Sequence, residues 1–186
     1  MRQTGHLLIL AVTLAAVSTG AQAADPPKKQ CYLGKFKSLS PQELEAFKKA
    51  KDAFEESMLL TDRTCRVQIF HRSWSVKQLQ VKERLLFLEA ELKLTVEVLG
   101  KMSKSNLEGY LGRPLWTLRY ISQELQRCIP QAQDSRHSSR LTHWLHKLQE
   151  AREKETQGCL EASVMFNLFR LLLEDLKCVA RGELCI

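Results

Sequence analysis

The 186-residue sequence predicts an all-α fold, arranged as a helical bundle, and three observations support this. Apolar residues recur at helical spacing in several long segments, which is the pattern of helices with a buried face. No segment alternates between apolar and polar residues as a strand does. Ser-x-x-Glu patterns, prolines and glycines fall at the ends of the periodic segments, where helices begin and end. The chain length suits one domain with its own core.

The N-terminus predicts a signal peptide over residues 1–23. Arg2 supplies a positive start, Leu7–Val17 is a short apolar run, and Ala21-Gln22-Ala23 fits a cleavage site. The apolar run is too short to span a membrane. We therefore expect a secreted, extracellular protein whose residues 24–186 form a single domain, without stable membrane insertion.

The first predicted helix runs from Pro41 to about Leu59. Ser40 and Glu43 form a capping box, and proline suits the first helical position. One side of the helix carries the apolar residues Leu44, Phe47, Phe54 and Met58. Residues 60–80 then form a long irregular loop, in which Trp74 is expected to anchor the loop to the domain rather than to bind a ligand.

Two further long helices are predicted over residues 81–102 and 107–129. In the first, Leu85, Leu88, Leu92 and Leu99 mark the core face. Its glutamates, Glu89, Glu91 and Glu97, are interpreted as solvated. In the second, Ser105 and Glu108 form another capping box, and Gly112 and Pro114 predict an interruption with a kink.

A shorter helix is predicted after Ser139 as its cap, and the last long helix covers Cys159–Ala180. The core face of the last helix is assigned to Leu160, Val164, Leu168, Leu171 and Leu172. A narrow polar strip is assigned to Ser163, Asn167, Arg170, Glu174 and Lys177. Because so little of the circumference is polar, this helix is either central to the bundle or keeps Phe166 and Phe169 for a partner.

All six cysteines follow the predicted cleavage site, and an even number in an exported chain favours disulfides. Cys178 and Cys185 are close enough in sequence to pair, whereas spacing leaves the other four open. The pattern of His143 and His146 does not predict a metal site, because no ligand partners lie at the right spacing. The sequence contains no catalytic motif, so we expect neither an enzyme nor a cofactor.

The formal net charge of +7 is spread along the helices together with acidic residues. This pattern does not predict nucleic-acid binding, since there is no basic stripe. It leaves open an alternative function, namely a basic secreted host-defence protein that acts on anionic membranes or glycans.

Several long motifs resemble the type III interferons, the interferon lambda family. They are CYLGKFKSLSPQELEAFKKAKDAFEESMLLTDRTC at 31–65, LEAELKLTVEVL at 88–99, RPLWTLRYISQELQRCI at 113–129, RLTHWLHKLQEAREKE at 140–155 and GCLEASVMFNLFRLLLEDLKCVA at 158–180. The resemblance implies a helical cytokine bundle of the interleukin-10 structural class, with up-up-down-down topology. It also implies a monomeric ligand that joins the interferon lambda receptor chain to the interleukin-10 receptor beta chain and triggers antiviral JAK–STAT signalling.

The resemblance further implies three disulfides and a receptor-binding surface. The implied pairs are Cys31–Cys128, Cys65–Cys159 and Cys178–Cys185. The implied receptor contacts on the first helix are Pro41, Leu44, Lys48, Lys49 and Asp52. On the last helix they are Phe166, Phe169 and Arg170, which agrees with the excess of apolar surface there.

Overall fold

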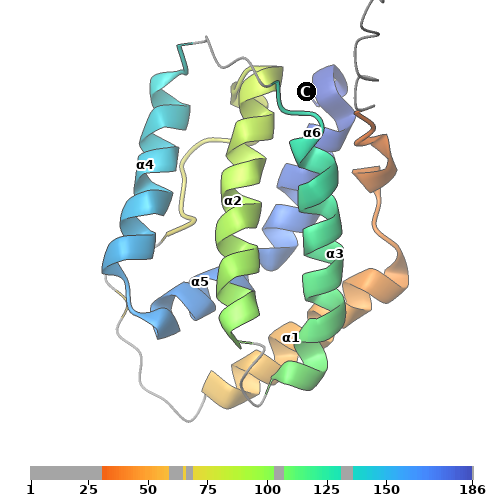
Figure 1. Ribbon diagram of the computed structural model, residues 1–186, viewed down its shortest axis with the longest axis vertical. Helices are drawn as coiled ribbons and strands as arrows, with labels where there is room; N and C mark the ends of the chain where they lie inside the picture. The colour runs from red at the N-terminus through yellow and green to blue at the C-terminus, as the bar shows by residue number, and fades with distance from the viewer. Residues whose placement is uncertain (1–30, 59–64, 66–68, 103–106, 131–135, 186) are drawn as a thin grey trace, which may run out of the picture.

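The computed structural model describes residues 31–58, 65, 69–102, 107–130 and 136–185, and within them the regular elements are helices (Figure 1). The predicted signal peptide, residues 1–23, lies outside the described residues, as does the turn at 61–64. The long helices are α1 (Pro41–Met58), α2 (Val81–Met102), α3 (Glu108–Gln126), α4 (Ser139–Lys154) and α5 (Gln157–Arg170). The last helix continues through a π-helical turn, η3 (Leu171–Asp175), into α6 (Leu176–Arg181). Short 3-10 turns are η1 (Gly34–Lys37), η2 (Val76–Gln78) and η4 (Gly182–Leu184). The all-α prediction is confirmed.

The helices pack around α2, which contacts α3, α4, α5 and α6. In Figure 1, α1 and α2 both run towards the bottom of the view, whereas α3 and the final helical stretch run back to the top. This is the up-up-down-down order, with α4 added beside α2. The long connection after α1 permits two successive helices to run in the same direction.

The predicted start of α1 is confirmed in detail. The backbone N–H of Glu43 donates to the Ser40 hydroxyl at 3.2 Å, and the Ser40 N–H donates back to the Glu43 carboxylate at 3.1 Å. This reciprocal pair satisfies two donors that a helix N-terminus leaves free. Behind it, Phe47, Ala50 and Phe54 are buried against the core.

The last helix is longer than predicted, because Thr156 caps it by accepting from the backbone N–H of Cys159. Leu160, Val164, Leu168, Leu171 and Leu172 are all buried, as predicted. The helix ends at Gly182, whose φ of 58° lies in the left-handed region where only glycine is unstrained.

Three disulfides close the structure, and they are the pairs that the family resemblance implies: Cys31–Cys128, Cys65–Cys159 and Cys178–Cys185. The first joins the segment before η1 to the end of α3. The second joins the long loop to the start of α5. The third holds the C-terminal turn against α6.

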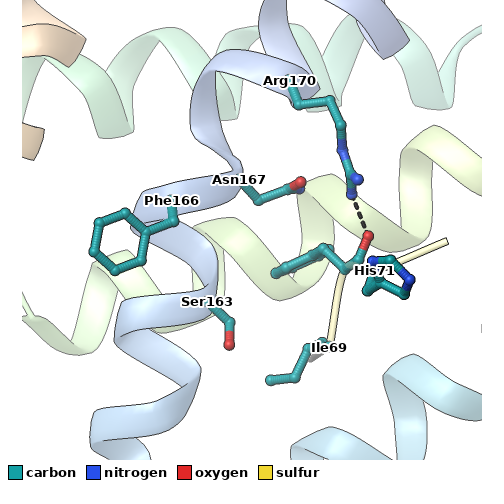
Figure 2. A pocket seen from close by; sticks show the side chains of 7 residues that line it. Ile69, His71, Ser163, Phe166, Asn167 and Arg170 are labelled. Carbon is teal, nitrogen blue, oxygen red and sulfur yellow. Dashed lines mark hydrogen bonds between the residues drawn. The ribbon is translucent and has the colours of Figure 1, made fainter. Parts of the chain in front are cut away.

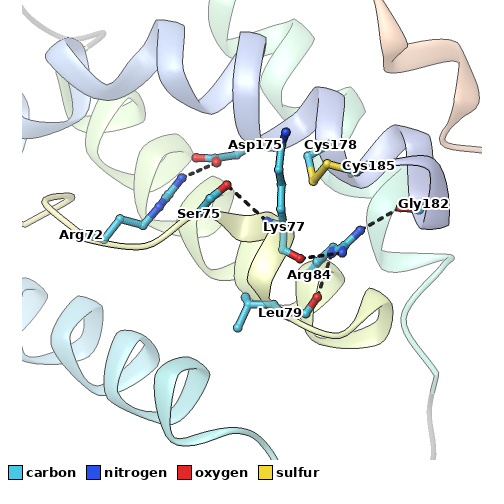
Figure 3. The surroundings of a disulfide bond; sticks show 9 residues. All are labelled: Arg72, Ser75, Lys77, Leu79, Arg84, Asp175, Cys178, Gly182 and Cys185. Atoms are coloured by element: carbon cyan, nitrogen blue, oxygen red, sulfur yellow. Dashed lines mark hydrogen bonds and ion pairs between the residues drawn. A yellow bond between two sulfur atoms is a disulfide. The ribbon is translucent and has the colours of Figure 1, made fainter.

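The buried residue Arg84 fastens the start of α2 to this C-terminal turn. Its guanidinium donates to the carbonyls of Leu79, Lys77 and Gly182, at 2.8–2.9 Å (Figure 3). Three carbonyl acceptors compensate for removing one guanidinium from water. Segments that are distant in sequence are therefore tied at one point.

Three interpretations of single residues were wrong. Glu91 is completely buried rather than solvated, and Asn167 is buried rather than part of an exposed polar strip. The cap of α4 is Ser138, one residue before the predicted Ser139, because the Ser138 side chain accepts from the N–H of Leu141. In addition, α3 runs without a break through Gly112 and Pro114.

The predicted cap residue Ser105 lies outside the described residues, and Leu107 occupies the N-cap position of α3 without a side-chain cap. Trp74 anchors its loop as predicted, since its ring packs edge-on against Phe87 and Trp144 at 5.7 and 5.8 Å. Among the helices of the described ranges, none is both long and apolar enough to cross a membrane.

Candidate receptor-binding surface

The predicted residues of α1 form a strip along its outer side. At about 100° per residue, Pro41, Leu44, Lys48 and Asp52 fall within one quadrant of the helix. The Lys48 ammonium and the Asp52 carboxylate pair at 2.7 Å, and this pairing raises the pKa of Lys48. Lys49 is exposed and lies about 60° beyond Asp52, so it falls outside this quadrant and borders the strip.

Phe166 of α5 packs against α1 through Phe54 and Lys51, which lie outside the strip itself. Its side chain is 52% exposed, although it meets the ring of buried Phe54 edge-on at 6.3 Å. The Lys51 ammonium lies 5.8 Å from the centre of the Phe166 ring. An aromatic ring held by two neighbours and still open to solvent is the usual form of an interface anchor.

An open groove of about 240 Å³ lies beside Phe166 (Figure 2). It is lined by Ile69, Phe70, His71, Ser163, Phe166, Asn167 and Arg170. One side therefore comes from α5. The other comes from the middle of the long loop, and we call this segment, Ile69–His71, the loop wall. Ile69 and Phe70 are buried, whereas His71 is exposed.

Arg170 is half-buried, and its guanidinium donates to the backbone carbonyl of Phe70. Burial, and next the charge of Arg72, lower the pKa of Arg170. The neighbouring Asn167 is buried, and its Nδ2 has no hydrogen-bond partner among the described residues. Phe169 is half-buried and packs against the core, so it offers less surface to a partner than Phe166 does.

A group of buried charges lies behind the loop wall. The Arg72 guanidinium donates to the Asp175 carboxylate and lies 3.4 Å from Glu91. Burial, reinforced by the Asp175 charge, raises the pKa of Glu91 well above its usual range. From α4, the Lys147 ammonium donates to the carbonyl of His71 at 2.8 Å.

Sequence reasoning missed Arg72, Lys147 and Lys51 as parts of this region. Lys51, which lies beside Phe166, pairs with Glu55 at 2.5 Å. No local sequence pattern marks Arg72 or Lys147, because the acids that pair with Arg72 and the carbonyl that accepts from Lys147 are distant in sequence.

A second exposed surface lies on α3. Trp116 is 65% exposed and stacks on Tyr120 with ring centres 5.7 Å apart. The Lys35 ammonium donates to the Tyr120 hydroxyl at 2.7 Å and to Glu124 at 2.6 Å. We call Trp116, Tyr120 and Lys35 the α3 aromatic face.

Within the described ranges, no cluster of three or more His, Cys, Asp or Glu side chains could hold a metal ion. The groove is open, and the carboxylates of Glu91 and Asp175 behind it both pair with Arg72. The arrangement is suited to recognising another protein surface.

Comparison with known proteins finds one matching family model and several similar chains. A family model described as Interleukin-28A matches residues 28–182. The chain is 51% identical to Interferon lambda-2 of Mus musculus, over 97% of this chain and 99% of that protein. It is 55% identical to Interferon lambda-1 of Homo sapiens, over 85% of this chain and 80% of that protein. It is 40% identical to Interferon lambda-3 of Gallus gallus, over 97% of each chain.

Proposed function

The chain belongs to the interferon lambda family of cytokines, and from this premise we propose that it is a secreted ligand of a two-chain class II cytokine receptor. The receptor chains are the interferon lambda receptor chain and the interleukin-10 receptor beta chain. Joining them triggers JAK–STAT signalling and an antiviral state. In this proposal residues 1–23 are removed on export, and the mature protein acts as a monomer.

The first receptor chain binds the surface shared by α1 and α5. The observation that carries this assignment is the 52% exposure of Phe166, on a helix whose one other aromatic residue, Phe169, is half-buried. Aromatic anchors supply most of the binding energy in many interfaces. Lys48 and Lys49, both exposed, add positive charge that accelerates encounter with an acidic receptor surface.

The second receptor chain needs a separate surface, because one ligand must contact both chains at once. The α3 aromatic face supports this requirement. Tryptophan and tyrosine are the residue types most enriched at interface hot spots, and stacking on Tyr120 holds Trp116 in one orientation before binding.

The test is a binding assay with the purified extracellular parts of both receptor chains, combined with a STAT reporter in responding cells. Binding to the interferon lambda receptor chain, with reporter activity that requires both chains, is expected. A mature protein that binds neither chain and instead permeabilises anionic vesicles would favour the host-defence alternative.

A further inference from the structure

The loop wall is held in place through its backbone carbonyls. Arg170 of α5 donates to the carbonyl of Phe70, and Lys147 of α4 donates to that of His71 at 2.8 Å. Within the loop itself, the Arg72 Nε donates to the carbonyl of Trp74, two residues later in the chain, at 3.1 Å. Three cationic side chains thus fasten a five-residue stretch that has no regular secondary structure of its own.

Arg72 differs from the other two because its side chain is almost wholly inside the protein, at 5% exposure. It lies between Glu91 of α2 and Asp175 of the π-helical turn (Figure 3 shows the Asp175 contact). The centres of the Phe87 and Trp144 rings are 4.8 and 5.7 Å from the guanidinium carbon. The side chain therefore points away from the groove, into a cage of acids and rings.

This cage sets the position of the loop rather than adding much to overall stability. A buried ion pair gains little over well-packed apolar residues, because removing the charges from water is costly. Its main effect is selective, since a displaced Arg72 guanidinium would leave two acidic groups buried beside aromatic rings, with Arg170 as the remaining positive charge nearby. A planar fork that pairs with acids and stacks on rings is specific to arginine, so lysine cannot replace it fully.

The next residue back along the chain is His71, which lines the groove. We propose that Arg72 is a positioning residue that holds the loop wall in the conformation that the receptor chain recognises. Arg72 does not itself touch the receptor. The inference rests on the proposed function, in which the groove beside Phe166 faces the first receptor chain.

The first arm of the test needs no receptor. Hydrogen exchange is measured for residues 69–74 in the wild type and in Arg72→Met, with the exposed residue of α4 in Arg140→Met as the matched control. Exchange of these loop amides should accelerate at least tenfold in Arg72→Met, while α3 keeps its protection. Unchanged exchange in the loop would overturn the inference.

The second arm separates positioning from stability. The variant Arg72→Met with Glu91→Gln and Asp175→Asn removes the unpaired acids, so its resistance to denaturant should exceed that of Arg72→Met alone. Its affinity for the interferon lambda receptor chain should nevertheless stay about tenfold below wild type, because only about a tenth of the molecules hold the loop correctly. Affinity that recovers together with stability would show a structural role only and overturn the inference.

The two proposals fail in different ways. Wild-type protein that does not bind the receptor chain would overturn the proposed function, and with it the receptor-related part of this inference. Normal wild-type binding together with normal binding by Arg72→Met would overturn only the role of Arg72. Arg72→Lys should bind the receptor chain with an affinity between those of wild type and Arg72→Met. Wild-type affinity in Arg72→Lys would also count against a role specific to the arginine side chain.

Discussion

Replacing Phe166 with alanine should weaken receptor binding while leaving the fold intact. The ring buries about half of its surface, so its removal forfeits about half of the ~1.5–3 kcal/mol that full burial provides. Losing the edge-on contact with Phe54 adds about 0.5–1.5 kcal/mol. The expected loss of unfolding free energy is therefore about 1–3 kcal/mol, less than the ~5–15 kcal/mol that typically stabilises a domain.

The loss of receptor affinity is a separate effect, because a protein that stays folded still lacks the ring at the interface. Truncation of an aromatic anchor at an interface centre typically costs about 2 kcal/mol or more. At 1.4 kcal/mol per tenfold change, this corresponds to an affinity roughly 30-fold lower. Surface plasmon resonance with the extracellular part of the interferon lambda receptor chain measures the change, and circular dichroism measures the helicity.

Leu173→Ala is a matched control, because Leu173 is also an exposed apolar residue of the last helical stretch, at 46% exposure. It lines a different hollow, beside Lys77 and Arg181, and its replacement should change receptor affinity less than threefold. Unchanged affinity in Phe166→Ala would refute the assignment of the α1/α5 surface. A joint fall in affinity and helicity would instead assign Phe166 to the core.

The remaining predictions concern the buried acid, the second surface and a disulfide. Burial raises the pKa of Glu91 above its usual value, so its contribution to stability is present at low pH and lost as the pH rises through the raised pKa. As the pH rises from about 5 to about 7.5, the free energy of unfolding measured in denaturant titrations should therefore fall less in Glu91→Gln than in wild type. An equal fall in both proteins would contradict the burial of Glu91. Trp116→Ala should keep its affinity for the interferon lambda receptor chain but lower reporter potency about tenfold or more, whereas full potency would exclude the α3 aromatic face. Replacing Cys65 and Cys159 with serine should lower the unfolding free energy by about 4–5 kcal/mol on the chain-entropy estimate, and a loss below about 1 kcal/mol would show that the long loop is held by other contacts.

The helix boundaries could be predicted where the signals are local. The capping box at Ser40 and Glu43 places the start of α1 correctly, because both partners lie within one turn. The bounds of α2 match the predicted 81–102, since apolar spacing and the polar segment after Gly100 are also local features. The core face of the last helix follows from periodicity for the same reason.

The buried charges could not be predicted in this way. Glu91 lies between Ala90 and Leu92, and a seven-residue leucine repeat made it look like the solvated side of α2. At 100° per residue it lies only about 60° from Leu88, on the side of Phe87, which the repeat did not take into account. Its partner Arg72 is 19 residues away and Asp175 is 103 residues from Arg72, so no local pattern connects them.

The same contacts change how the predicted receptor residues should be probed. Arg170 was assigned to the receptor surface, but its guanidinium also holds the Phe70 carbonyl of the loop wall. A loss of binding in Arg170→Ala would therefore combine a lost contact with a displaced loop. The Phe166 ring cannot form a hydrogen bond, and its contacts with Phe54 and Lys51 are made to α1, so its truncation leaves the hydrogen bonds that fasten the loop wall in place. The ring is thus the side chain whose removal reports on the receptor surface itself.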